Sequence, residues 1–143
     1  MSEIKVMHAN KSHREFLIHA NKVINNVNST EQTNGLEQNI DKDYFCDKPK
    51  FQCLVAEVDN KPVGMILYSY FYWANDGEIL WISQMFIEEE YRKQGVFFKI
   101  IGKLREENKH IRIVSCATGN GNKRMKKILK YYGGHEINLK FYY

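Results

Sequence analysis

The chain contains 143 residues, of which 43% are hydrophobic and 13% aromatic, and this composition predicts a single folded domain over residues 1–143. Its apolar content excludes a disordered chain, and the sequence has no apolar run near the roughly 20 residues that a membrane-spanning helix needs. The net charge of +4 suits anionic ligands in general and does not by itself indicate nucleic acid.

The N-terminus and the cysteines predict the location of the protein. The first residues, MSEIKVMHANK, lack the apolar core of a signal peptide. The cysteines are odd in number and widely spaced, which favours reduced thiols over a disulfide framework: Cys46, Cys53 and Cys116. CxxC and HExxH spacings are absent from the sequence. We therefore expect a cytoplasmic protein without membrane association and without a bound metal.

Residues 4–8 alternate weakly and predict a first strand. Ser12 is a plausible helix cap, and apolar residues at helical spacing follow it: Phe16, Leu17, Ala20, Val23 and Ile24. The polar stretch 25–35 predicts a loop. A second short helix is indicated by Leu36, Ile40, Tyr44 and Phe45. The histidines of this region do not share a helix face at ligand spacing, so we interpret them as solvated or capping residues: His8, His13 and His19.

Residues 51–58 alternate and predict a strand, and the turn residues 59–62 predict a hairpin into a second strand over 63–73. Gly64 in that strand indicates a bulge or a close backbone approach. The strand ends in an aromatic run: Tyr68, Tyr70, Phe71, Tyr72 and Trp73. This run is interpreted as core and sheet surface, with an apolar wall for a substrate as the alternative.

The most informative stretch runs from Glu78 to Leu104. Large apolar residues over 79–87 predict a buried strand, and three glutamates, 88–90, should end it at the surface. A basic loop with a glycine follows, and then an amphipathic helix over 95–109. Because a helix start presents unpaired N–H groups and a positive dipole end, Arg92, Lys93 and Gly95 indicate a site for a phosphorylated ligand. An ordinary connection between strand and helix with a solvated basic turn is the alternative.

After this helix, Ile111, Ile113 and the residues up to Ala117 predict a further strand. Gly119–Asn122 predicts a loop into a last helix, and alternation over 135–143 predicts a closing strand. One face of the last helix is basic: Lys123, Lys126, Lys127 and Lys130. That face is interpreted as solvated, with contacts to a ligand phosphate or to nucleic acid as alternatives.

The segment Met85–Val96 resembles the acetyl-CoA-binding segment of the GNAT superfamily of N-acetyltransferases. That family has a hydrophobic strand, a short acidic or proline-containing link, and Arg/Gln-x-x-Gly-x-Gly/Ala opening a helix. Here the pattern reads Arg92-x-x-Gly95-x-Phe97, so Phe replaces the last small residue. The resemblance implies an α/β GNAT fold of order β-α-α-β-β-β-α-β-α-β, with a single mixed, mostly antiparallel sheet and helices on both faces. It is nearest to the diamine acetyltransferase branch.

The resemblance implies transfer of an acetyl group from acetyl-CoA to a primary amine by direct attack on the thioester. It assigns the pantetheine arm to the key strand at Met85, Phe86 and Ile87. The pyrophosphate falls on the loop and helix start: Arg92, Lys93, Gln94, Gly95, Val96 and Phe97. Asn122 matches a family asparagine on the last helix.

The catalytic positions of the branch are altered in this chain. A family glutamate that assists deprotonation aligns with Ser83, next to Gln84, and neither is a carboxylate. Glu78, earlier on the strand, is interpreted either as a base acting through water or as a strand-edge charge. The family tyrosine aligns with Leu129, and Tyr132, one turn later, is interpreted as either its substitute or a core residue.

Three functions therefore remain open at this point. The first is an N-acetyltransferase acting on a small molecule or peptide amine. The second is a catalytically idle protein that binds acyl-CoA for sensing or structure. The third, ranked last, is a nucleic-acid-binding module using the lysine face, which lacks a recognition motif. The family often forms dimers, so a homodimer is an expectation as well.

Overall fold

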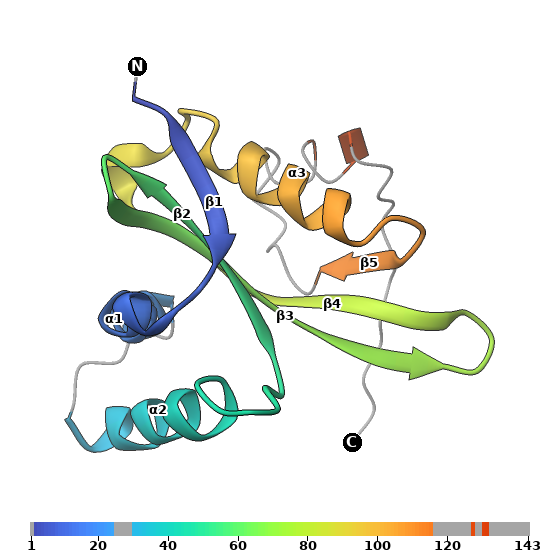
Figure 1. Ribbon diagram of the computed structural model, residues 1–143, viewed down its shortest axis with the longest axis horizontal. Coiled ribbons are helices and arrows are strands. Elements are labelled where there is room, and N and C mark those ends of the chain that lie inside the picture. The colour runs from blue at the N-terminus through green and yellow to red at the C-terminus, as the bar shows by residue number, and fades with distance from the viewer. Residues whose placement is uncertain (1, 25–29, 116–126, 128–129, 132–143) are drawn as a thin grey trace.

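The computed structural model describes residues 2–24, 30–115, 127 and 130–131 (Figure 1). In chain order the elements are β1 (Ile4–His8), the 3-10 helix η1 (Lys11–His13), α1 (Arg14–Ile24), α2 (Thr30–Asp43), β2 (Gln52–Val58), β3 (Lys61–Trp73), β4 (Gly77–Ile87), the 3-10 helix η2 (Glu89–Tyr91), α3 (Val96–Glu107) and β5 (Arg112–Ser115). None of the helices described is both long and apolar enough to cross a bilayer.

The described strands form one sheet in the order β1-β2-β3-β4-β5. The first three pairings are antiparallel and β4 pairs with β5 in parallel, through the crossover helix α3. The expected mixed, mostly antiparallel α/β sheet is confirmed. The expected last helix and closing strand fall largely on residues outside the described part of the chain.

Helices cover both faces of the sheet. Figure 1 shows α1 and α2 on one side and α3 on the other. The α3-face core contains Leu54, Ile66, Tyr68, Leu80 and Leu104 among its buried side chains. The opposite core joins α1 and α2 to other residues of the same strands, among them Leu17, Ile40, Cys53, Met65 and Phe86. Because both faces of β2 are covered, residues 53–56 are all buried, where a one-sided strand would alternate with solvent.

Three sequence predictions in the first half are corrected. The cap is Asn10, not Ser12, and it caps η1, which leads directly into α1: the backbone N–H of Ser12 donates to Asn10 Oδ1 over 2.9 Å. The predicted loop 25–35 is helical from Thr30, even though Gly35 lies within the helix, because a polar stretch can extend a helix outward from its packed end. The apolar residues expected to close this helix, Tyr44 and Phe45, lie beyond its end and pack edge-on against each other.

The hairpin between β2 and β3 is confirmed, with both turn residues, Asp59 and Asn60, at positive φ (52° and 63°). Both interpretations of Gly64 are confirmed as well. The register shifts between Ala56 and Glu57, opposite Gly64. A Cβ at Gly64 would lie 3.2 Å from Val96 Cγ1 and 3.3 Å from the backbone oxygen of Phe86. The missing side chain therefore lets the start of α3 pack directly on β3.

Candidate functional site

The candidate site begins where β4 ends. The backbone N–H of Glu88 donates to Val63 O over 2.8 Å, and η2 follows at once, so the three glutamates end the strand as predicted. Residues 92–95 then lead into α3. The strand, the loop and the helix are therefore arranged in the predicted order.

The backbone of this loop is held in an unusual conformation. Lys93 and Gly95 both have positive φ, 64° and 83°. A left-handed conformation costs about 1–2 kcal/mol for a residue with a side chain, and such conformations gather at functional sites. Alternation between left- and right-handed residues turns successive N–H groups inward, which forms a concavity suited to an anion.

Gly95 leaves the start of α3 open. It is the N-cap residue, and no side chain caps the helix there. Apart from its chain neighbours, a Cβ built on Gly95 would meet no atom within 4 Å in the part of the chain that the structure describes. The first turn of a helix carries the positive end of the helix dipole. An open approach to this end fits a phosphate group.

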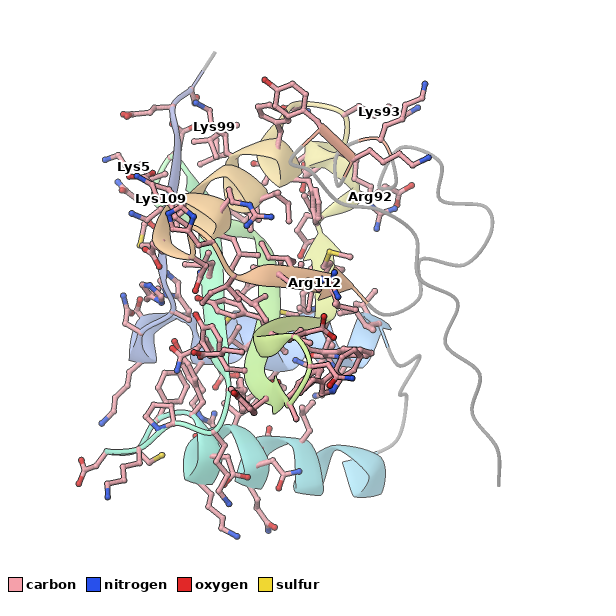
Figure 2. The ribbon with its side chains drawn as sticks, turned by 90° about the vertical axis from the view of Figure 1, so that its right-hand side faces the viewer. Lys5, Arg92, Lys93, Lys99, Lys109 and Arg112 are labelled. Carbon is pink, nitrogen blue, oxygen red and sulfur yellow. The ribbon has the colours of Figure 1, made fainter. Side chains whose placement is uncertain are left out.

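The polar side chains of the loop fix its shape and supply charge. Arg92 Nε donates to Ile87 O over 3.0 Å, and Gln94 Nε2 donates to Glu90 O over 2.8 Å, so both tie the loop back to the segment before it. Arg92, Lys93 and Gln94 are all exposed. Figure 2 shows the arginine and the lysine extending outward from this end of the molecule. An anion at the helix start would meet two cations.

The departure from the family pattern does not close the loop. Phe97 is only 8% exposed and packs in the α3-face core with Ile100 and Leu104. Val96 is 2% exposed in the same cluster. The Phe97 ring is thus directed into the protein and away from the N–H groups that precede it.

The edge of β4 next to this loop is only partly paired. β5 pairs with β4 from Ile79 to Ile82, and no described strand lies beside residues 83–87 on that side. Within this stretch Met85 and Ile87 pack against the α3-face core, while Phe86 belongs to the opposite core. Backbone groups along a strand edge can pair with an extended ligand. The assignment of the pantetheine arm to this edge stays a prediction.

The candidate catalytic residues lie apart. Ser83 is the extra residue of a bulge in β4, since Ile82 pairs with Tyr68 and Gln84 with Leu67. Its hydroxyl donates to Leu67 O over 3.2 Å. Glu78 is exposed and pairs with Tyr72 near the far end of the hairpin, about 17 Å from Ser83 at ~3.4 Å per residue. Asn122, Leu129 and Tyr132 lie outside the described residues.

The aromatic run divides between core and surface. Tyr68 is buried, and burial raises the pKa of its hydroxyl. The ring of Phe71 lies 5.5 Å from Trp73 and 5.6 Å from Trp81 between centroids, and all three residues are half-buried. Tyr72 is 74% exposed. The substrate-wall interpretation stays a prediction for the half-buried cluster.

Sequence reasoning did not predict one contact beside the candidate site, which is made by His19 of α1. Its Nε2 lies 2.9 Å from Glu88 Oε1, and its ring packs edge-on against Phe86 at 5.8 Å between centroids. This contact joins α1 to the end of β4. The two partners are 69 residues apart in sequence, and no local pattern could have indicated their pairing.

The family of the chain follows from sequence comparison. The sequence profile described as acetyltransferase (GNAT) family matches residues 22–133. Thialysine N-epsilon-acetyltransferase of Mus musculus is 30% identical over 111 residues, 71% of this chain and 65% of that protein. The Bos taurus protein of the same name is 29% identical over 118 residues, 76% of this chain and 69% of its own length. The chain thus spans about two thirds of these relatives.

Solved structures share the fold. An aminoglycoside N-acetyltransferase in complex with CoA superposes with a TM-score of 0.75 at 18% identity, covering 100% of this chain and 95% of that one. A predicted acetyltransferase from Clostridium acetobutylicum with acetyl-CoA gives 0.73 at 14% identity, covering 99% and 96%. The architecture is that of the N-acetyltransferases. With the profile match over most of its length, the chain belongs to the acetyltransferase (GNAT) family.

Proposed function

We propose that this protein transfers the acetyl group of acetyl-CoA to a primary amine of a small molecule or peptide. The observation that carries the proposal is the open start of α3, with Gly95 at its N-cap and Arg92 and Lys93 beside it. The relatives, named as N-acetyltransferases, support the same reaction.

In this proposal the pyrophosphate of acetyl-CoA binds at residues 92–97. The pantetheine arm runs back along residues 87 to 85 of β4, pairing with the open strand edge. The thioester then lies near the bulge at Ser83 and Gln84. The amine nitrogen attacks the thioester carbon, a C–N bond forms, the C–S bond breaks, and the amine proton ends on the sulfur of CoA. Holding both reactants in place supplies much of the rate enhancement.

A thermal melt with and without acetyl-CoA tests the cofactor. At a hundredfold excess over Kd, binding adds roughly 2.7 kcal/mol, which for a domain of this size raises Tm by roughly 5–10 °C. Gly95→Ala should remove this shift, because its Cβ enters the space proposed for the phosphate. Gly77→Ala is the matched control: Gly77 also has positive φ (80°) and open space around it, but is the first residue of β4, next to the β3–β4 turn.

The two glycine variants should lose similar stability, since each places a side chain in the left-handed region. Only Gly95→Ala should lose the acetyl-CoA shift. The proposal is wrong if the folded wild-type protein gives no shift at millimolar acetyl-CoA, or if both variants keep it.

One observation favours a second function, the idle acyl-CoA binder. The residue at the family glutamate position is Ser83, whose hydroxyl is already used to bond Leu67 O. Thiol release from acetyl-CoA in the presence of an amine panel separates the two. Turnover supports the enzyme, whereas cofactor binding without turnover for any amine supports the binder.

A further inference from the structure

Gln84 lies at the bulge of β4, one residue after the position where the diamine branch has its glutamate. It pairs directly with Leu67 of β3, and directly opposite residues share a face of the sheet. Leu67 belongs to the core under α1 and α2, so the Gln84 side chain is on that face as well. On its far side, β4 is unpaired by any described strand from residue 83 onward.

The side-chain carbonyl of Gln84 has an unmet hydrogen-bonding capacity. Its Oε1 is buried and has no hydrogen-bond partner, and it is the one such side-chain atom found among the residues that the structure describes. Buried polar atoms in native proteins are rarely left unpaired, because the lost hydration is not recovered. An unpaired acceptor next to a proposed reaction centre suggests a donor supplied by a ligand.

Most charged groups on the elements that cover this face are engaged in ion pairs. On β4 the flanking carboxylates are Glu78 and Glu88, six and four residues from Gln84. Among the described residues, α1, α2 and the segments beside them carry the His19–Glu88, Arg14–Asp41 and Asp43–Lys50 pairs and half-buried Glu37. The bulge itself therefore offers a neutral acceptor and no carboxylate.

We infer that Gln84 Oε1 accepts a hydrogen bond from the attacking nitrogen, and that the preferred acceptor is a weakly basic amine that reaches the site already neutral. This inference rests on the proposed function and names the substrate class of the same site. A neutral amide oxygen can orient an N–H group toward the thioester, but it cannot take the proton from an ammonium. The proton must be lost to water before the attack.

The size of the preference follows from acid–base equilibria. An alkyl ammonium of pKa about 10.4 is roughly 0.1% neutral at pH 7.5, whereas an α-amino group of pKa about 8 is roughly a quarter neutral. The supply of nucleophile thus differs by roughly 200-fold. The lower intrinsic reactivity of the weaker base reduces this advantage, so we expect a preference of tenfold or more in kcat/KM.

The first test compares two acceptors of similar size, one alkylamine and one α-amine, by thiol release from acetyl-CoA between pH 6.5 and 10. For each acceptor, kcat/KM should rise tenfold per pH unit and level off at that acceptor's own pKa. If kcat/KM levels off at the same pH for both acceptors, independent of their own pKa values, a protein group removes the proton and the inference is overturned.

The second test is Gln84→Met, which keeps the side-chain length and removes the acceptor atom. Because Oε1 has no partner in the free protein, Tm should be unchanged or higher. The KM for acetyl-CoA should stay constant, and kcat/KM for the amine should fall about tenfold, the worth of one hydrogen bond. Gln38→Leu, at an exposed position of α2, is the control and should change nothing.

Two further variants complete the test. Gln84→Glu should raise the relative activity toward the alkylamine, since a carboxylate can take its proton. Glu37→Gln should leave the rise of kcat/KM with pH unchanged for both acceptors. Loss of that rise for either acceptor would identify Glu37 as a base and overturn the inference. Unchanged kcat/KM in Gln84→Met would overturn it too.

The failure of the proposed function is recognised separately. If acetyl-CoA gives no thermal shift, the proposed function itself has failed, whereas the amine comparisons test only the role of Gln84.

Discussion

At the scale of single residues, His13 shows how one buried side chain joins a helix cap to the sheet. Its Nδ1 accepts from the backbone N–H of Asn10 over 3.0 Å, so the ring proton must be on Nε2, which lies 2.6 Å from Glu57 Oε2. The residue is 1% exposed. Sequence reasoning listed capping as one role for this histidine, but it could not predict the partner on β2.

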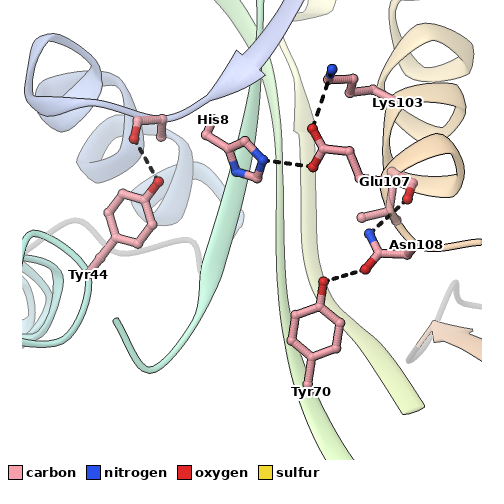
Figure 3. Close-up of polar contacts among 8 residues, drawn as sticks. His8, Tyr44, Tyr70, Lys103, Glu107 and Asn108 are labelled. Carbon is pink, nitrogen blue, oxygen red and sulfur yellow. Dashed lines mark hydrogen bonds and ion pairs between the residues drawn. The ribbon is translucent and has the colours of Figure 1, made fainter. Parts of the chain in front are cut away.

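His13→Ala should lower the free energy of unfolding by roughly 2–4 kcal/mol, because it removes part of a capping box and leaves a carboxylate without its donor. Urea denaturation measures this loss. His8→Ala is the control: its Nε2 lies 2.7 Å from Glu107 Oε2 (Figure 3), but the side chain is 48% exposed, and such a pair contributes at most about 1 kcal/mol. Equal losses in the two variants would contradict the structural role of His13.

Tyr44 should make the protein sensitive to alkali. Its hydroxyl donates to Ala9 O over 2.7 Å, and burial raises its pKa to about 12 from 10.0. The folded state therefore favours the protonated phenol, so this contribution is complete below pH 10 and is lost as the pH rises toward 12. Between these pH values the free energy of unfolding, measured by urea titration, should fall less in Tyr44→Phe than in the wild type. The same fall with pH in both proteins would contradict this.

At the scale of elements, the packing of α3 on the sheet depends on Gly64. Gly64→Ala places a Cβ 3.2 Å from Val96 and 3.3 Å from the Phe86 carbonyl, so either the helix start or the strand must move. We expect a loss of about 1–3 kcal/mol and a weaker acetyl-CoA shift. Gly35→Ala, in α2 with no neighbour within 4 Å, should instead stabilise the protein by about 0.5–1 kcal/mol. Thermal melts of both variants, with and without acetyl-CoA, check the contrast.

The elements themselves were predictable to different degrees. Periodicity predicted β1, the β2–β3 hairpin, β4 and α3, because each carries a regular apolar pattern and ends in turn or charged residues. The start of α2 was missed, since the residues from Thr30 are polar and helix formation there is not marked by an apolar stripe. The loop of the candidate site was predictable from Arg92 and Gly95. The positive φ of Lys93 was not, because no side chain of that type signals it.

At the scale of the whole molecule, the sequence could predict the sheet and the helices on both faces but not the contacts between distant segments. The pair His19–Glu88 and the pair His13–Glu57 join helical segments to strands across 69 and 44 residues. The unpaired Oε1 of Gln84 is likewise a property of packing, since a glutamine in a strand is ordinarily interpreted as polar surface. Its role became arguable only with the β4 bulge in place.

The charge of the whole molecule leads to the last prediction. Figure 2 shows Arg92, Lys93, Lys99 and Lys109 in the upper part of the molecule, around α3, and the net charge is +4. CoA carries a pyrophosphate and a further phosphate, so its association should weaken as salt screens these charges. Lys99→Glu, at the fourth residue of α3, should weaken acetyl-CoA binding by on the order of threefold at low ionic strength and by less at high salt. Lys42→Glu, at the exposed end of α2, should not. Isothermal titration at two salt concentrations measures both. A salt-independent Kd would mean that hydrogen bonds from the helix start, and not the surrounding cations, hold the phosphates.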